Sequence, residues 1–247
     1  MSEPMRLLID PPTEPAENMG RDQALLARVA GGAGSPTLRF YQWSPAAISL
    51  GYFQRFTEYA ALGPPLGALP VVRRVTGGGA IVHADELTYS LTLPAEHRLV
   101  RSNPACLYDR VHAAIIATVR TFGIPADRRG PCNAPSHAQR GPFLCFSRAH
   151  ASDVVVNGAK LAGSAQRRVR GAVLQHGSII LRRRFDEQPS AAIRGTVDLA
   201  RFIDVLVRGL EAELDIESVA DVWSDEAIQI AREEAARFRD PTWTQRR

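Results

Sequence analysis

The amino-acid sequence predicts an α+β fold in a single domain, and three observations carry this prediction. The chain has 247 residues, a length that favours one large domain. Strand-like apolar patterns gather between residues 38 and 93 and again between residues 153 and 181. Helical patterns occupy the start, the middle and the last part of the chain, without an internal repeat or a clear linker. We therefore expect residues 18–247 to form one domain, preceded by a loosely ordered arm over residues 1–17.

Composition narrows the class of protein. Hydrophobic residues make up 45% of the chain and charged residues 23%, a mix that excludes disorder as the main state. No apolar stretch is long enough to span a bilayer, and the acidic, proline-rich start MSEPMRLLIDPPTEP lacks the apolar segment of a signal peptide. Three cysteines are too few, and odd in number, for a disulfide framework. We therefore expect a protein of the reducing cytoplasm.

The elements of the first half are expected in the following order. Asn18 is a capping residue for a helix that runs through Val29 and that a Gly-Gly pair ends. Strands follow, because short apolar or alternating runs are bounded by turn residues. These runs cover residues 38–40, 47–52, 69–75, 80–83 and 88–93.

The second half begins with another helix. The Asn-Pro pair at residues 103–104 is a helix start, and an apolar stripe continues from it to Phe122. Residues 124–143 are rich in Pro, Gly and Arg and predict a long loop, which in a compact domain tends to be functional. A strand is expected over residues 172–181, and Asp198 and Ser224 cap two closing helices.

Lysine occurs once in the chain, at Lys160, and the other 29 of the 30 basic residues are arginines. The Asn157-Gly158 pair predicts a tight hairpin that places Lys160 early on the return strand. Because an ammonium is a compact charge with a tunable pKa, a lone lysine indicates a site where guanidinium cannot serve. The net charge of +4 suits an acidic partner. The arginines are scattered without interleaved aromatics, however, so we expect no nucleic acid partner and a solvated basic surface for most of them.

A glycine-rich turn lies between two predicted strands, in the run RRVTGGGAIVH over residues 73–83. It lacks the Gly-Lys-Ser/Thr of a Walker loop and the helix-opening pattern of a dinucleotide site. Three successive glycines let the backbone approach a ligand and present N–H groups to an oxyanion. A plain flexible loop is the alternative, but Arg73, Arg74 and His83 around the turn favour a site.

The candidate nucleophile is Cys145, which directly follows the long loop in the run FLCF. An apolar setting is more typical of an inert core cysteine. The segment nevertheless leads into the Lys160 hairpin, and a nearby cation favours the nucleophilic thiolate. Cys132 in the loop stays open as a second candidate, whereas Cys106, in the first turn of a helix, is interpreted as structural.

Small and polar residues also interrupt two strands that should be buried. Gly163, Ser164 and Gln166 follow Lys160, while His176 and Gly177 lie in the next strand. Glycine in a strand often marks the close approach of a ligand, although a lone histidine there is more often a satisfied core residue. The chain has no Cys-x-x-Cys and no His-x-x-x-His, so zinc chemistry is not indicated.

These runs resemble the lipoate–biotin protein ligase superfamily. The run over residues 73–83 resembles its signature, and NGAKLAGSAQ over residues 157–166 resembles its lysine strand. The Cys145-Phe146 pair and VLQHGSI over residues 173–179 resemble, more narrowly, the cysteine-dependent octanoyltransferases of lipoyl synthesis; so do LGYFQ and DELTYS. The resemblance implies a mixed β-sheet flanked by helices, as in the catalytic domain of biotin and lipoate protein ligases.

The resemblance also implies a reaction. Cys145 would attack octanoyl-acyl carrier protein to give an acyl-enzyme, while Lys160 polarises the thioester carbonyl. The octanoyl group would then pass to a lysine of a lipoyl-carrier protein, such as the glycine cleavage H protein or the E2 lipoyl domain of a 2-oxoacid dehydrogenase. Neither a metal nor a nucleotide would be needed, and no membrane partner is implied. The implied substrate-binding residues are Arg73, Thr76, Gly77, Gly78, Gly79, His83, Gly163, Ser164, Gln166, His176 and Gly177.

Two departures from the family pattern keep alternatives open. Ala84 stands where ligase relatives usually carry aspartate, and Gly79 stands where the cysteine-dependent transferases often carry arginine. One alternative is an ATP-dependent lipoate–protein ligase that acts through lipoyl-adenylate. The other is a non-catalytic protein that binds acyl carrier proteins.

Overall fold

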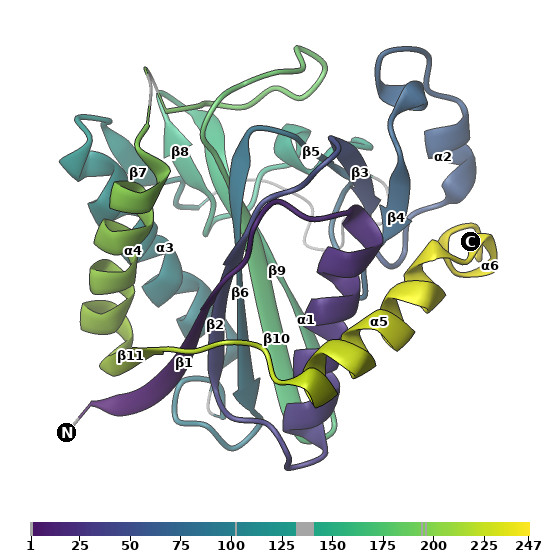
Figure 1. The fold of residues 1–247 in the computed structure, drawn as a ribbon. Helices are drawn as coiled ribbons and strands as arrows, with labels where there is room; N and C mark the ends of the chain where they lie inside the picture. Colours follow the sequence, from purple (N-terminus) through teal and green to yellow (C-terminus); the bar gives the residue numbers. More distant parts are fainter. Residues whose placement is uncertain (1, 102, 132–140, 194, 196) are drawn as a thin grey trace.

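The computed structural model describes residues 2–101, 103–131, 141–193, 195 and 197–247, and a mixed sheet of eight strands forms its centre (Figure 1). The strands, in spatial order, are β11 (Ile216–Ala220), β1 (Glu3–Ile9), β2 (Thr37–Tyr41), β6 (Glu86–Pro94), β10 (Ala172–Ile180), β9 (Ala159–Val169), β8 (Val154–Val156) and β7 (Ala126–Arg128). β1 runs parallel to both of its neighbours, and every other pair in this sheet is antiparallel. The predicted α+β class and the mixed sheet are confirmed.

A second, smaller sheet lies beside the upper end of the first (Figure 1). Its central strand β3 (Ala47–Leu50) runs parallel to β4 (Val71–Arg73) and antiparallel to β5 (Ile81–His83). Between β3 and β4 the chain forms the short helix α2 (Phe56–Ala60) and the one-turn 3₁₀ helix η1 (Leu66–Ala68). The glycine-rich turn therefore connects β4 to β5, as the sequence predicts.

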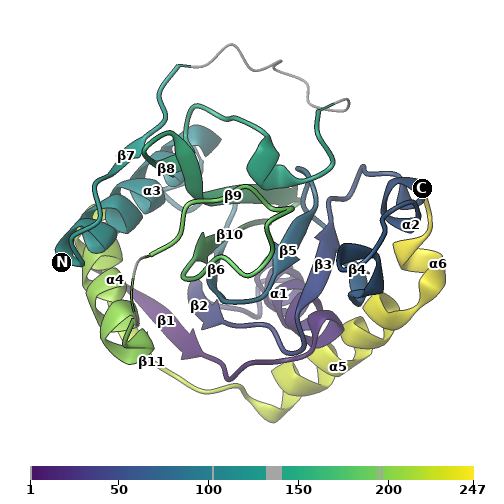
Figure 2. The ribbon, with the colours of Figure 1, turned by 90° about the horizontal axis from the view of Figure 1, so that it is seen from above.

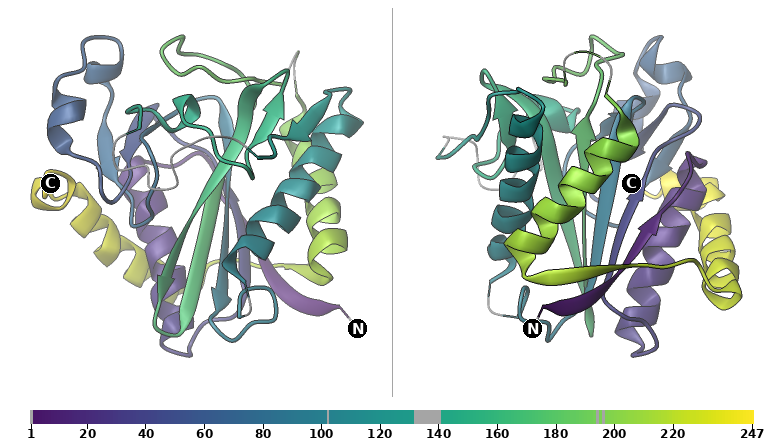
Figure 3. Two further views of the ribbon diagram at one scale, coloured as in Figure 1. Left: turned by 180° about the vertical axis from the view of Figure 1, so that it is seen from behind. Right: turned by 60° about the vertical axis from the view of Figure 1, so that its left-hand side comes forward.

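Helices cover both faces of the large sheet (Figure 3). On one face lie α1 (Pro15–Ala30) and α5 (Asp225–Arg239), followed by the short α6 (Pro241–Thr244). On the other face lie α3 (Pro104–Thr121) and α4 (Leu199–Leu214). The first pair crosses closely at Gly20, where a β-carbon would come within 2.5 Å of the Ala231 carbonyl oxygen.

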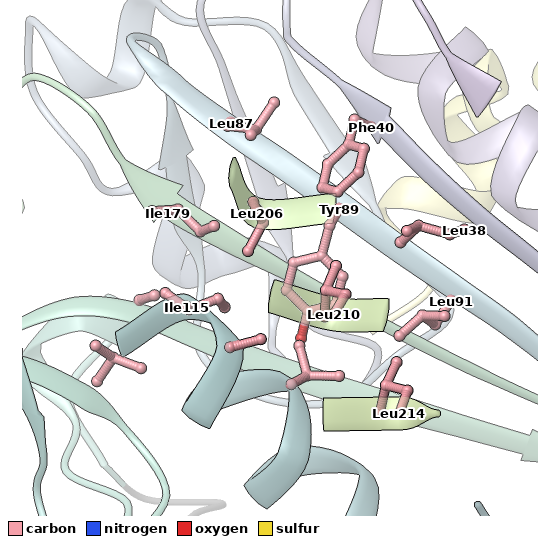
Figure 4. Packing of buried hydrophobic residues seen from close by; sticks show 14 of the residues in the cluster. Leu38, Phe40, Leu87, Tyr89, Leu91, Ile115, Ile179, Leu206, Leu210 and Leu214 are labelled. Atoms are coloured by element: carbon pink, nitrogen blue, oxygen red, sulfur yellow. The ribbon is translucent and has the colours of Figure 1, made fainter. Parts of the chain in front are cut away.

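The main hydrophobic core fills the space between the sheet and the α3–α4 layer (Figure 4). Leucines of α4 meet inward-facing residues of β2, β6 and β10, and the apolar stripe of α3 closes the other side. Removing this much apolar surface from water is the main source of stability. The labelled members of the cluster are Leu38, Phe40, Leu87, Tyr89, Leu91, Ile115, Ile179, Leu206, Leu210 and Leu214.

The helix caps and the tight turn predicted from the sequence are present in the structure. The side chain of Asn103 caps α3, and Asp198 and Ser224 cap α4 and α5 by accepting from backbone N–H groups. At the β8–β9 hairpin, Asn157 and Gly158 both have positive φ, 49° and 79°, which the tight turn requires. These predictions are confirmed.

The expected N-terminal arm needs correction. Residues 3–9 form β1, which is hydrogen-bonded on one side to β2 and on the other to β11, a strand that the sequence reading missed. Met5 and Leu8 are each 1% exposed, so the segment is part of the core. The helix begins at Pro15 rather than after Asn18, and the buried Asn18 side chain donates to the Thr13 and Gln42 carbonyls. The helix starts earlier than expected because Pro15 is well suited to the first helical position. The arm is ordered because β11, which lies about 200 residues further along the chain, pairs with it.

Candidate active site

A cavity with about 430 Å³ of empty space, which is open to solvent, lies where α1 and the small sheet meet β9 and β10. Seven of its lining residues belong to the set that the sequence predicts: Gly78, His83, Cys145, Gly163, Ser164, His176 and Gly177. The other nine are Met19, Tyr41, Trp43, Ser49, Arg74, Ile81, Thr88, Ala165 and Ser178.

Cys145 begins the one-turn 3₁₀ helix η3 (Cys145–Ser147), directly after a bridge between Leu144 and Ala80. Its backbone N–H donates to the Ala80 carbonyl at 2.7 Å, which fixes the cysteine beside the glycine-rich turn. The residue is half-buried. Cys106 is exposed and does not line the cavity, and Cys132 lies outside the described residues. Of the two described cysteines, Cys145 is the one at the site.

Lys160 lies next to Cys145 and is held by a residue that the sequence reading missed. Its Nζ donates to Cys145 Sγ at 3.6 Å and to Asp153 Oδ1 at 2.8 Å. The Lys160 and Asp153 side chains are each only 4% exposed. Burial on its own would lower the pKa of Lys160, but the charges of Cys145 and Asp153 outweigh it and raise that pKa, so the amine is an ammonium at neutral pH. The ammonium therefore contacts a thiol and a carboxylate at the same time.

Gly163 makes room for that ammonium. A β-carbon at Gly163 would lie 2.3 Å from Lys160 Cε and 2.6 Å from Lys160 Nζ, so the end of the lysine side chain crosses the strand where Gly163 has no side chain. The sequence prediction that glycine here marks a close approach is met by a side chain of the protein itself.

We expect Gly163→Ala to fold but to acylate Cys145 slowly, because the new methyl group would displace the flexible end of Lys160 from the sulfur. A shift of about 1 Å in a catalytic group can cost on the order of 10²-fold in rate. The measurement is the rate of acyl-enzyme formation by intact mass, beside a thermal melt. Gly63→Ala is the matched control, because a β-carbon there has no neighbour within 4 Å. Acylation of Gly163→Ala at the rate of the control would contradict the positioning role.

The glycine-rich turn is fastened by Arg74. Its Nη2 donates to the carbonyls of Gly77 and Gly79 at 2.7 and 2.8 Å, and its Nη1 donates to the Ser49 carbonyl at 2.9 Å. Burial lowers the pKa of Arg74 to about 10, which still leaves the guanidinium charged at neutral pH. Gly79 packs on the nucleophile segment, since a β-carbon there would lie 2.8 Å from the Cys145 backbone nitrogen. Any side chain at residue 79 would therefore have to move Cys145.

Arg73, predicted to bind substrate, does not line the cavity. Its Nε and Nη2 donate to the Thr244 carbonyl at 2.9 and 2.7 Å, and its Nη1 donates to the carbonyls of Gly51 and Gln54. The fully buried guanidinium thereby ties the segment after α5 to the loop after β3. Gly77 and Thr76 are likewise not in the cavity lining.

Two histidines line the cavity and are held by buried carboxylates. His83 Nδ1 lies 2.5 Å from Glu86 Oε1, and the ring stacks on Trp43 with centroids 3.7 Å apart. Burial lowers the pKa of His83, although Glu86 opposes the shift, so the ring is mainly neutral at neutral pH. His176 Nδ1 lies 3.1 Å from Asp22 Oδ2, which orients the ring. Thr76 Oγ1, at 2.6 Å, contacts the opposite nitrogen of His176.

The hydroxyl of Ser164 is directed away from the cavity-facing side. His176, whose side chain faces the cavity, pairs with Ala165 across the two strands, and Ser164 pairs with the next residue, Gly177. Because side chains alternate along a strand, the Ser164 side chain points to the opposite face of the sheet. Ser164 Oγ lies 2.7 Å from His112 Nε2 on α3 and 2.6 Å from the Tyr89 hydroxyl. Burial lowers the pKa of His112 to about 4, so this imidazole is neutral at physiological pH.

Gln166 belongs to the same side of the sheet as Ser164. Its Nε2 donates to Gln175 Oε1 at 2.7 Å, and Gln175 in turn donates to the Tyr89 hydroxyl at 3.0 Å. Gln166 does not line the cavity. The sequence run that contains Lys160 and Gly163 therefore splits between two faces, with only part of it at the site.

The described residues contain no group of three or more His, Cys, Asp or Glu placed to hold a metal ion. Within the same part of the chain, no helix is long and apolar enough to cross a membrane. Asp153, Trp43 and Met19 are among the site residues that were not proposed from sequence. Asp153 had one usable signal, because it is the acidic residue just before the apolar strand that leads into the Asn-Gly hairpin.

Comparison with known proteins agrees with this site. A model of the lipoyl protein ligase A/B catalytic domain matches residues 14–226. Octanoyltransferase LipM of Moorella thermoacetica is 36% identical over 236 residues, covering 88% of this chain and 84% of that protein. Octanoyltransferase LipM of an Exiguobacterium species is 46% identical over 175 residues, covering 68% of this chain but 63% of that protein's length.

Solved structures show the same fold. A lipoate protein ligase of Thermoplasma acidophilum with bound lipoic acid has a TM-score of 0.76 at 21% identity, covering 99% of this chain and all of that one. A lipoate-protein ligase A bound with ATP has a TM-score of 0.77, also at 21% identity, with 99% of both chains covered. The predicted superfamily and the predicted enzyme class agree with these relatives. The chain belongs to the lipoyl protein ligase A/B catalytic domain family.

Proposed function

We propose that the protein is an octanoyltransferase of protein lipoylation that works through an octanoyl thioester on Cys145. The observation that carries the proposal is the pair of Cys145 Sγ and Lys160 Nζ, 3.6 Å apart at the cavity. An ammonium beside a thiol is the setting that favours a nucleophilic thiolate in proteins. The names of the LipM relatives support the octanoyl group as the one transferred.

In the first step, the Cys145 thiolate attacks the carbonyl of an octanoyl thioester on acyl carrier protein. A new carbon–sulfur bond forms, the bond to the carrier sulfur breaks, and the carrier leaves as a thiolate that takes a proton from water. Negative charge grows on the carbonyl oxygen as the tetrahedral intermediate forms. The buried ammonium of Lys160, held in place by Asp153, is positioned to stabilise that oxygen.

In the second step, a lysine amine of a lipoyl-carrier protein attacks the Cys145 thioester. An amide bond forms, the Cys145 thiolate leaves, and the amine loses its proton to solvent. The acceptor would be the glycine cleavage H protein or the lipoyl domain of a 2-oxoacid dehydrogenase E2.

Both described cysteines are free thiols, as suits a reducing compartment such as the cytoplasm.

The cavity suits a medium-length acyl chain beyond the reacting carbonyl. Met19, Trp43, Ile81 and Ala165 supply apolar lining, and Gly78 brings the backbone of the turn to the wall. A tail of methylene groups gains about 0.8 kcal/mol for each one that leaves water. The hydrophobic cavity therefore supports a fatty acyl substrate rather than a charged one.

We expect acylation of Cys145 by octanoyl carrier protein without ATP or magnesium, because a thioester is already activated. The test is incubation with the donor followed by intact mass, which should show one octanoyl adduct. Peptide mapping should locate the adduct on Cys145. A requirement for ATP with free octanoate or lipoate, together with no reaction on the thioester, would reassign the protein to the lipoate–protein ligases. Binding of the carrier without any adduct would instead make it a carrier-binding protein.

A further inference from the structure

Three arginines surround the ring of Tyr52 at the surface next to the glycine-rich turn. The guanidinium carbons of Arg246, Arg167 and Arg247 lie 4.2, 5.2 and 5.5 Å from the ring centroid. Arg246 and Arg247 are exposed and Arg167 is half-buried. Within the described part of the chain, none of the three forms an ion pair with a carboxylate. We call Tyr52 and these arginines the arginine cluster.

The fold builds the arginine cluster from three distant segments. Arg167 comes from β9, Tyr52 follows β3, and the other two follow α6. Arg73 joins the last two segments, because its guanidinium holds both the Gly51 and the Thr244 carbonyls. Figure 2 shows the end of the chain lying beside α2, as the hydrogen bond from Phe56 N–H to the Arg247 carbonyl requires. The cations are therefore positioned by a buried framework.

Bringing the positive charges together is unfavourable without an anion. Burial, together with the charges of Arg246 and Arg247, lowers the pKa of Arg73 to about 10. Hydrogen bonding from Arg246 lowers the pKa of the Tyr52 hydroxyl. Guanidinium groups gathered around one ring repel each other, so a bound anion would reduce the electrostatic repulsion within the cluster.

The arginine cluster borders the active site. The Tyr52 N–H donates to the Thr76 carbonyl at 2.8 Å, and Gly77 faces the Phe53 ring. Arg167 also lies four residues beyond Gly163 on β9, on the same face of the sheet, about 13 Å along the strand. An anion bound by the cluster would thus lie outside the cavity while a chain attached to it reached inward to Cys145.

We propose that the arginine cluster binds the phosphate of the phosphopantetheine arm that carries the donor thioester. The inference rests on the proposed function, since it assigns the anion to the carrier of the octanoyl group. Guanidinium groups match the planar, paired acceptors of a phosphate, and a phosphate recognised here would set how deep the thioester enters. The thioester would then meet Cys145 while the carrier protein stays at the surface.

The test measures binding of phosphopantetheine and of pantetheine, which lacks the phosphate, by calorimetry. We expect the wild-type protein to bind phosphopantetheine on the order of 10-fold more tightly, as hydrogen bonds to charged groups imply. We expect the double variant Arg246→Gln/Arg247→Gln, and Arg167→Gln separately, to lose this difference. Arg208→Gln, an exposed arginine of α4 on the other face of the sheet, is the matched control and should keep it.

Equal binding of the two compounds by the wild-type protein, or an unchanged difference in the variants, would overturn the phosphate site. So would variants that weaken binding of the whole carrier protein while leaving the two small compounds unaffected, because the cluster would then contact an acidic protein surface. Acylation of Cys145 by octanoyl-pantetheine, measured on the same samples, reports separately on the proposed function. Failure there, with the phosphate preference intact, would leave the anion site standing and reject the transferase.

Discussion

Replacing Cys145 with alanine should abolish octanoyl transfer and leave the protein folded. Without the sulfur no acyl-enzyme can form, and removing a nucleophile typically costs on the order of 10⁴-fold or more in rate. The fold should tolerate the change, because the residue is only half-buried in a one-turn helix and its backbone contact with Ala80 does not need the side chain. Lys160 should keep its partner Asp153, which lies 2.8 Å from it in the wild-type protein. The measurement is the amount of octanoyl adduct by intact mass, with a thermal melt to confirm folding.

The other cysteines supply the controls. Cys106→Ala removes an exposed thiol that does not line the cavity, so it should be acylated at the wild-type rate. Cys132→Ala should be nearly silent as well, a prediction that comes from the sequence because this residue lies outside the described part of the chain. Loss of transfer in Cys132→Ala, with transfer retained in Cys145→Ala, would show that the wrong thiol has been assigned.

Local chemistry made much of the fold predictable. Helix caps such as Asn103 and the Asn157-Gly158 turn act through neighbouring backbone groups, so their signals are contained in a few residues. β1 was missed because its partner β11 lies some 200 residues further along the chain, and no pattern within a short segment predicts such a pairing. The short C-terminal α6 was also missed, although Asp240 caps it directly before Pro241; its position depends on Arg73, which donates to the Thr244 carbonyl.

The site was predicted in part for a similar reason. Cys145, Gly78 and His176 were proposed, and the structure brings all three to one cavity. What a motif could not convey is the direction of each side chain. Ser164 follows Gly163 directly, yet strand alternation sends its hydroxyl to His112 on the opposite face. Asp153 was missed because its role depends on a loop conformation, and only the fold places its carboxylate against Lys160.

The structure now gives a reason why Lys160 should not be replaceable by arginine. The end of the lysine side chain occupies the space over Gly163, between Cys145 and Asp153. A guanidinium is wider than an ammonium and favours a two-bond contact with a carboxylate. In Lys160→Arg we therefore expect the new side chain to bind Asp153 and to leave the position from which a donor can reach the thioester oxygen.

We expect Lys160→Arg to slow acylation of Cys145 on the order of 10²–10³-fold, the usual cost of losing one donor to a developing oxyanion. Lys160→Ala should do at least as much damage, but it also removes one of the two cations paired with the buried Asp153, the other being Arg129 at 3.5 Å, so it changes the local structure as well. The arginine variant is therefore the sharper test, because it keeps a cation beside Asp153. Its acylation rate is measured by intact mass on protein whose thermal melt matches the wild type. A surface lysine could be exchanged for arginine with an effect of about 0.5 kcal/mol or less. Acylation of folded Lys160→Arg at a near-wild-type rate would thus remove Lys160 from the catalytic machinery and leave Asp153 as its structural partner only.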